Sequence, residues 1–216
     1  MSIFFWIMWT ILYLPMRILY PTKIVNKKTF FDKNKAIIAC NHTSNIDIIL
    51  VKSRQHTKSY VLAKHTLFKN KFLGACLKSF GGIPVNREAV DLSTIKQTLK
   101  VLKDGHQLII FPEGTRKNSI NETESVKTGM IMFALKSNSP IIPMVLLKRP
   151  RIFTLNKILV GEPIDFSKYK EEKQTKELLQ KLSNIVLIQM QTLREQYYQE
   201  QRLKKAKRTQ KHKFIS

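Results

Sequence analysis

The sequence is short of acidic residues and of cysteine. Its 216 residues include 15 aspartates and glutamates against 38 lysines and arginines, so the formal net charge is +23 at pH 7. An excess of this size predicts a negatively charged partner surface, which would be phospholipid, nucleic acid or an acidic protein. Cys40 and Cys76 provide neither a disulfide framework nor a C-x-x-C metal spacing. We expect both to be buried thiols in a reducing compartment.

The first twenty residues do not have the pattern of a signal peptide, because a basic first region and a small-residue cleavage site are both missing. The apolar run Ile3–Leu14 is shorter than the roughly 20 residues that a bilayer span needs. Its tryptophan and tyrosine side chains suit the depth of lipid headgroups. We therefore expect residues 1–20 to form a membrane-associated helix that lies in one leaflet. A full span over Ile3–Tyr20 and a helix buried in the core are the alternatives.

From Thr22 onward, short apolar runs alternate with helical patterns, and this alternation predicts an α/β fold. The length and the apolar fraction of 43% fit a single domain with a substantial core, which we place at residues 21–200. The expected strands are Lys23–Val25, Ala36–Cys40, Ser59–Leu62, Gly82–Val85, Gln107–Phe111, Ile141–Leu147 and Ile158–Val160. The expected helices are Ser44–Ser53, Thr66–Ser79, Glu88–Lys103, Ser125–Ser137 and Thr175–Glu200. Residues 201–216, with seven basic residues and no acid, are expected to be a basic C-terminal tail.

The stretch from Ile37 to Asp47 joins an expected buried strand to a helix. Its S-x-x-D pattern, Ser44 to Asp47, is typical of a helix N-cap followed by an acid in the first turn. A carboxylate that folds back onto a ring nitrogen of His42 would fix the tautomer of the imidazole and leave the other nitrogen as a general base. On these residues alone, the more common interpretations are that Asp47 is a capping acid and His42 a structural donor.

Three further strand ends carry cations. Lys64 follows the third strand, Arg87 the fourth, and Arg116 the fifth, just beyond Glu113. Ligands of open α/β sheets bind at the carboxyl ends of the strands, and guanidinium groups bind phosphate with two parallel hydrogen bonds. Each of these cations alone is more often a solvated surface charge in so basic a protein. Their repeated placement at strand ends leads us to expect that they converge on a phosphate. Glu113 would then either pair with one of the cations or bind a substrate hydroxyl.

Four motifs in this order and spacing resemble those of the glycerolipid acyltransferases, and most of all the bacterial 1-acyl-sn-glycerol-3-phosphate acyltransferases. The motifs are Asn41-His42-(x)4-Asp47, Gly81…Arg87, Phe111-Pro112-Glu113-Gly114-Thr115-Arg116 and Ile142-Pro143. The resemblance runs from about Pro21 to Gly161. It implies a mixed β-sheet flanked by helices.

The resemblance also implies a reaction. His42 would be the general base that takes the proton from the sn-2 hydroxyl of lysophosphatidate, and Asp47 would orient it. The oxygen would attack an acyl thioester, of coenzyme A or of acyl carrier protein, to make phosphatidic acid for phospholipid biosynthesis.

The remaining roles follow from the same resemblance. The acceptor phosphate would be held by Arg87, Arg116 and Lys64, and the glycerol site would be lined by Glu113, Gly114 and Thr115. Ile142 and Pro143 would line an apolar part of the cleft. No cofactor and no metal are expected beyond the thioester co-substrate, and the sequence has no metal-ligand spacing. The expected partners are an anionic membrane surface, lysophosphatidate and the acyl donor, and the expected location is the cytoplasmic face of the cell membrane.

Other functions remain open at this point. A basic nucleic-acid-binding protein would explain the charge, although an aromatic and basic stacking platform is missing. A hydrolase would explain His42, although there is no G-x-S-x-G nucleophile elbow. Within the acyltransferases, glycerol-3-phosphate or another lysophospholipid is the alternative acceptor.

Overall fold

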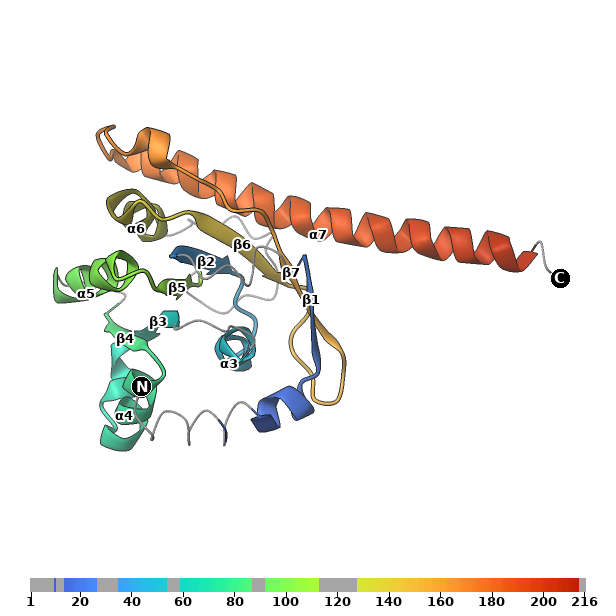
Figure 1. The fold of residues 1–216 in the computed structure, drawn as a ribbon, viewed down its shortest axis with the longest axis horizontal. Coiled ribbons are helices and arrows are strands. Elements are labelled where there is room, and N and C mark those ends of the chain that lie inside the picture. Colours follow the sequence, from blue (N-terminus) through green and yellow to red (C-terminus); the bar gives the residue numbers. More distant parts are fainter. Residues whose placement is uncertain are drawn as a thin grey trace.

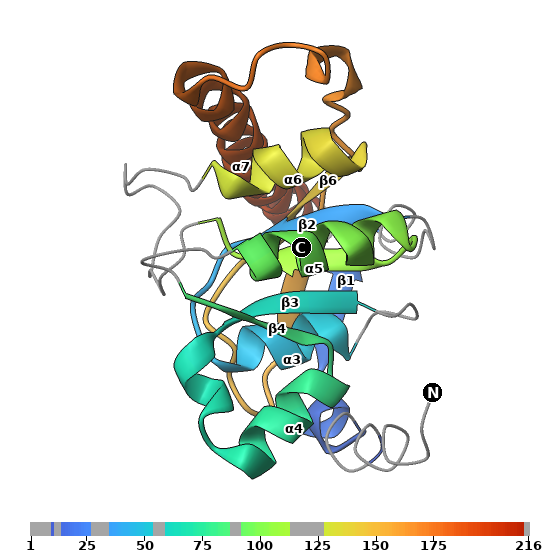
Figure 2. The same ribbon diagram turned by 90° about the vertical axis from the view of Figure 1, so that its left-hand side faces the viewer.

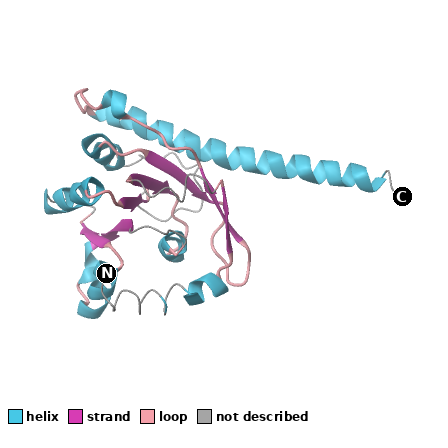
Figure 3. Cartoon of the chain, in the orientation of Figure 1, coloured by secondary structure: helices cyan, strands magenta, loops and turns pink. Residues whose placement is uncertain are grey.

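A seven-stranded sheet forms the centre of the protein in a computed structural model, which describes residues 10, 14–26, 35–53, 59–86, 92–112 and 128–213 (Figures 1 and 3). The strand order is β1-β7-β6-β2-β5-β3-β4. The strands are β1 (Thr22–Val25), β2 (Ala36–Cys40), β3 (Ser59–Lys64), β4 (Gly82–Val85), β5 (Gln107–Ile110), β6 (Ile141–Leu146) and β7 (Asn156–Val160). The helices are α3 (Ile46–Lys52), α4 (Lys71–Ser79), α5 (Leu92–Lys103), α6 (Gly129–Ser137) and α7 (Lys176–Lys213), with short 3₁₀ turns η1 (His65–Phe68) and η2 (Ser167–Tyr169).

The sheet is mixed, as expected. Strands β2 to β6 are parallel to one another, whereas β7 pairs antiparallel with β6 and β1 is parallel to β7. The carboxyl ends of five strands therefore meet at one edge of the sheet, which is where ligands bind in α/β folds. The segments after β2, β3, β4 and β5 are the ones that carry the candidate site residues.

Helices cover both faces of the sheet (Figure 2). Alternate side chains of β2 separate into two apolar clusters: Ile37 and Ala39 join the core residues of α5, α6 and α7. Ile38 and Cys40 join the opposite cluster, which includes Val51 of α3. A strand covered on both faces has to be apolar throughout, and this explains the uninterrupted apolar run in its sequence.

The C-terminal helix is longer than expected. The sequence predicted a helix that ends at Glu200 and a separate basic tail, but α7 continues to Lys213, about 57 Å from its start at 1.5 Å per residue. Its first half packs on the sheet through Leu182, Val186 and Met190. Beyond residue 200 it extends past the body of the domain (Figure 1), so the cations of the expected tail lie on a helix.

Two other segments can be compared with the expectations. The single helix expected at Thr66–Ser79 is divided into η1 and α4, because Asn70 has an extended backbone and its side chain caps α4 by accepting the N–H of Leu73 at 3.0 Å. Both cysteines are buried thiols, as expected. Most of the N-terminal apolar run falls outside the described residues, and among the helices that are described none has the length and hydropathy needed to cross a bilayer.

Candidate active site

Asn41 fixes the start of the site by bonding to a neighbouring strand. Its side-chain Oδ1 accepts the backbone N–H of Leu146 at 2.7 Å, and its Nδ2 donates to the carbonyl of the same residue at 3.1 Å. The amide of Asn41 and the backbone of Leu146 are buried. The N–H and the carbonyl of Leu146 therefore depend on the side chain of Asn41 for their hydrogen bonds. The loop after β2 is thereby held against the end of β6.

His42 and Asp47 face each other directly after this anchor. The distance from His42 Nδ1 to Asp47 Oδ2 is 3.1 Å, and the two residues are only 7% and 0% exposed. An ionised carboxylate can only accept hydrogen bonds, so Nδ1 carries the hydrogen and donates it to Asp47. The other ring nitrogen, Nε2, is then left with a lone pair that can accept a proton.

The carboxylate of Asp47 is itself held by the loop that carries His42. Its Oδ2 accepts the backbone N–H of Thr43 at 2.5 Å and of Ser44 at 2.6 Å. These charge-assisted bonds fix the position of the carboxylate and stabilise its negative charge. The bond to Ser44 is one half of the expected capping box, but Asn45, not Ser44, lies at the cap position of α3 and makes no side-chain cap bond.

The imidazole ring is also held by an aromatic neighbour. The ring of Phe111, directly after β5, lies with its centroid 4.2 Å from that of His42 and is tilted by 31°. Contacts on the ring face and the hydrogen bond at Nδ1 together leave the His42 ring little rotational freedom. The arrangement is that of a general base with an orienting carboxylate and a packed ring.

The cationic residues of the expected phosphate site can be placed only in part. Lys64 is the exposed last residue of β3, on the same sheet edge as His42, and it pairs in register with Val85 at the end of β4. Arg87, Glu113, Gly114, Thr115 and Arg116 lie outside the described residues. Their convergence on a phosphate remains a prediction.

Ile142 and Pro143 lie inside β6 and do not share one surface. Ile142 is buried in the cluster on the α3 side of the sheet. Pro143 is buried on the other side, where a Cβ built on Gly161 would come within 2.7 Å of its Cγ and 3.6 Å of Leu193. Adjacent residues of a strand face opposite sides, so these two side chains do not lie on one common surface. That either of them lines the substrate cleft remains a prediction.

Sequence reasoning assigned no role to Asn41 or Phe111, although both belong to the quoted motifs. The partner of Asn41 is 105 residues away, so no local pattern reveals it. Among the described residues, no group of three histidine, cysteine, aspartate or glutamate side chains is arranged to hold a metal ion.

The chain that carries this histidine–aspartate pair matches a known protein family. The acyltransferase family model matches residues 21–147, which is more than half of the chain, so the protein belongs to the acyltransferase family. The match spans the strands from β1 to β6 and includes the buried His42–Asp47 pair.

Particular relatives carry a more specific name. The chain is 32% identical over 152 residues to the 1-acyl-sn-glycerol-3-phosphate acyltransferase of Bacillus subtilis, covering 66% of this chain and 73% of that protein. It is 32% identical over 126 residues to the protein of the same name from Borreliella burgdorferi, covering 57% of this chain and 50% of that protein.

A solved structure shares the fold. It is the 1-acyl-sn-glycerophosphate (LPA) acyltransferase PlsC of Thermotoga maritima, with a TM-score of 0.60 and 23% identity over 82% of this chain and 72% of that chain. The expected mixed sheet flanked by helices is therefore confirmed both by the strand pairing and by this likeness.

Proposed function

We propose that this protein transfers a fatty acyl group from an acyl thioester to the sn-2 hydroxyl of 1-acyl-sn-glycerol-3-phosphate and so makes phosphatidic acid. The observation that carries the proposal is the buried pair of His42 and Asp47 at the carboxyl edge of the sheet. The relatives named for this reaction support the choice of acceptor.

The chemistry begins at Nε2 of His42. This nitrogen takes the proton of the acceptor hydroxyl while the hydroxyl oxygen forms a bond to the carbonyl carbon of the thioester. The carbon–sulfur bond then breaks, and the proton passes from His42 to the leaving sulfur, so the products are the new ester and a free thiol. General-base help of this kind contributes about 10²–10⁴-fold to the rate.

Asp47 acts on this step through the ring. Its carboxylate holds the Nδ1 hydrogen and stabilises the imidazolium that forms when Nε2 is protonated. Because Asp47 is fixed by two backbone N–H groups, this stabilisation is in place before the substrate arrives.

In the proposal, the acceptor phosphate is held by Lys64, Arg87 and Arg116, and the glycerol is lined by Glu113, Gly114 and Thr115. Lys64 lies on the required edge of the sheet. No cofactor takes part beyond the acyl-CoA or acyl carrier protein that donates the acyl group. The N-terminal segment and the basic surface hold the enzyme on the cytoplasmic face of an anionic membrane, where both lipid substrate and product reside.

The test is the formation of labelled phosphatidic acid from labelled lysophosphatidate, with acyl-CoA and acyl carrier protein supplied in separate reactions. We compare wild type with His42→Ala and with a matched control, His106→Ala, at the opposite edge of the sheet before β5. Loss of about 10²–10⁴-fold in His42→Ala alone, with an unchanged circular dichroism spectrum, supports the proposal.

Other outcomes have definite meanings. Equal activity in all three proteins shows that His42 is structural and that the mechanism is wrong. Release of free fatty acid in place of a diacyl lipid identifies a hydrolase. If wild type makes no product with either donor, then lysophosphatidate is not the acceptor.

A further inference from the structure

The loop between β6 and β7 presents apolar side chains to solvent. Ile152 is 52% exposed, Phe153 75% and Leu155 55%. A loop that connects antiparallel strands at a surface ordinarily ends in polar turn residues. Three large apolar side chains gathered at one loop tip therefore indicate a contact that the isolated molecule does not make.

The loop is built to hold its tip in this position. Phe153 has φ 54°, a left-handed conformation that a bulky residue rarely adopts. Asn156 maintains the turn: its Oδ1 accepts the backbone N–H of Arg151 at 3.1 Å, and its Nδ2 donates to the carbonyl of Thr154 at 2.8 Å. Such an outlier persists only where the surroundings enforce it, and it is characteristic of functional segments.

The tip is also attached to the N-terminal helical segment. The N–H of Phe153 donates to the carbonyl of Leu19 at 2.7 Å, and the N–H of Asn156 donates to the carbonyl of Pro21 at 2.8 Å. That helical segment, residues 14–19, exposes its own apolar side chains, Leu14 and Ile18. Figure 1 shows the loop reaching down to this helix, so two segments far apart in sequence form one apolar end of the molecule.

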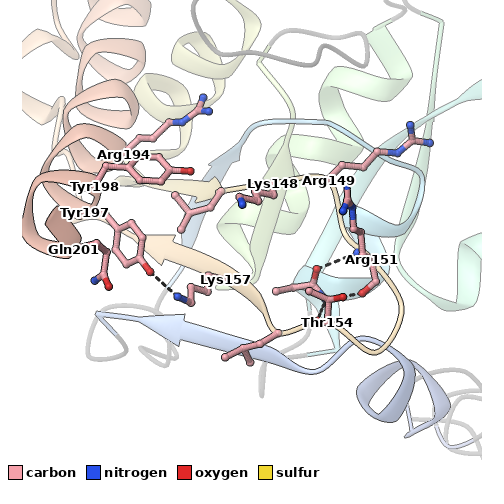
Figure 4. Close-up of a pocket in the computed structure, with 12 residues that line it drawn as sticks. Lys148, Arg149, Arg151, Thr154, Lys157, Arg194, Tyr197, Tyr198 and Gln201 are labelled. Atoms are coloured by element: carbon pink, nitrogen blue, oxygen red, sulfur yellow. Dashed lines mark hydrogen bonds between the residues drawn. The ribbon is translucent and has the colours of Figure 1, made fainter. Parts of the chain in front are cut away.

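Cations surround the base of the loop. Lys148, Arg149 and Arg151 precede the tip and Lys157 follows it, and together with Arg194 of α7 they line a cavity of about 650 Å³ (Figure 4). No acidic residue lines this cavity within the described part of the chain. Lys157 donates to the hydroxyl of Tyr197 at 2.8 Å. The other four cations that line the cavity can bind an external anion.

We propose that residues 148–156 form a second membrane-docking element, which inserts its apolar tip into an anionic bilayer while the cations at its base bind lipid phosphates. The order of side chains along the loop matches the order of layers in a leaflet, with apolar residues deepest and cations at headgroup depth. A nucleic acid would use the cations but has no use for the apolar tip. The inference rests on the proposed function, because an enzyme whose lipid substrate and product reside in a bilayer has to reach that surface.

The position of the loop gives the docking a purpose. It begins two residues after Leu146, the residue that Asn41 binds, and His42 is the next residue after Asn41. Docking of the loop therefore brings the carboxyl edge of the sheet to the membrane surface. A lysophosphatidate molecule held in that surface then needs to move little to place its hydroxyl near Nε2.

The first experiment places an environment-sensitive dye at the tip of the full-length chain through Phe153→Cys. The control is Glu171→Cys, at an exposed position distant in the fold. Wild type treated with the same dye reports any reaction of the two buried cysteines. Vesicles of phosphatidylglycerol and phosphatidylcholine should shift the emission of the dye at position 153 to shorter wavelength, but not that at 171. Pure phosphatidylcholine vesicles should have a weaker effect.

The second experiment removes the apolar tip. The double variant Ile152→Ser, Phe153→Asn retains a residue that tolerates a positive φ, and Leu203→Asn on the exposed end of α7 is its control. We expect affinity for anionic vesicles, and activity on lysophosphatidate within them, to fall at least tenfold. Activity on a short-chain lysophosphatidate dissolved as monomers should be unchanged.

These two experiments separate the possible failures. Unchanged vesicle affinity in the double variant, or a dye at position 153 that responds to acidic carrier protein and not to vesicles, would overturn the docking proposal. So would an equal loss of activity on the monomeric substrate, since the loop would then belong to the catalytic structure. If wild type makes no phosphatidic acid at all, the proposed function fails, while the dye still reports on the loop.

Discussion

The end of β2 and the loop at residues 148–156 lie at the same edge of the sheet, but they are built in opposite ways. At the end of β2, the side chains of Asn41, His42 and Asp47 are buried, and each has hydrogen-bond partners within the fold. In the loop, both the apolar tip and most cations are exposed. Proton transfer depends on positions fixed to a fraction of an ångström, whereas binding to a lipid surface adds many weak contacts. Single substitutions should therefore have large effects in the first region and small, additive effects in the second.

After His42→Ala, the largest effect is expected for Asp47→Asn. The amide has the shape of the carboxylate, and its oxygen should keep the place of Oδ2, because that atom also accepts the N–H groups of Thr43 and Ser44. The neutral amide, however, no longer stabilises the imidazolium that forms when Nε2 is protonated. The turnover rate should fall by about 10²–10³-fold with little change in KM for lysophosphatidate. Steady-state kinetics with a fixed acyl donor measure this, and a turnover within threefold of wild type would show that Asp47 only caps α3.

Lys52, at the other end of α3, tests what a buried charge does to stability. Burial lowers the pKa of its ammonium from 10.5 to about 7, and its Nζ donates to Oγ of Ser59 at 3.1 Å. Because the folded state releases this proton more readily than the unfolded state, stability should rise between about pH 7 and pH 10.5 and be lost again as the pH falls. The component due to Lys52 over this range is on the order of 5 kcal/mol, of which about 3 kcal/mol falls between pH 7.5 and pH 9.5.

The measurement is urea unfolding at pH 7.5 and at pH 9.5 for wild type, Lys52→Met and the exposed control Lys103→Met. Lys52→Met should reduce the gain in stability between the two pH values, and Lys103→Met should not. An equal gain in Lys52→Met would mean that the charge is solvated in the folded protein.

Asn41→Ala should lower the free energy of unfolding by about 1–3 kcal/mol, because it leaves the buried N–H and carbonyl of Leu146 without partners. The control is Asn45→Ala, four residues away, whose side chain makes no cap bond and should contribute less than about 0.5 kcal/mol. Urea midpoints compare the two variants. Equal midpoints would show that β6 finds other partners for its end.

The smallest effect is expected in the loop. Arg149→Gln and Arg151→Gln should each weaken binding to anionic vesicles by about 1 kcal/mol, or about fivefold. The effect should add in the double variant and shrink at 0.5 M salt, because salt screens exposed charges. Vesicle co-sedimentation measures it, with Lys181→Gln on α7 as the control. A loss of a hundredfold from one substitution would mean that the loop contains a specific site, not an additive surface.

The local sequence pattern was sufficient to predict those elements whose structure depends mainly on their own residues. Ala36–Cys40 and Gly82–Val85 are strands with the bounds that their apolar runs predicted, and the junction of His42 with Asp47 followed from spacing. The sequence did not predict the division at Asn70, because it depends on a single capping bond. It also did not predict that α7 continues past Glu200, because this part of the helix is polar and has no apolar periodicity.

Contacts between distant segments could not be predicted. The bond of Asn41 to Leu146, the ring of Phe111 on His42, and the attachment of Phe153 to Leu19 join residues from separate elements. The orientation of Ile142 and Pro143 to opposite sides of β6 follows only once the strand is known to lie inside the sheet. The pairing of His42 with Asp47 could be predicted from the sequence, but the contacts that hold the pair could not.

The bond between Asn41 and Leu146 also bears on how the enzyme is made. It joins residues 105 positions apart, so the loop that carries His42 cannot settle until β6 has been synthesised and has paired with β2. Contacts between such distant residues form late, because a long segment of chain has to be closed first. The geometry of the His42–Asp47 pair should therefore arise among the last events of folding, after the helices. If the proposed role of the pair is correct, partly folded chains should be inactive.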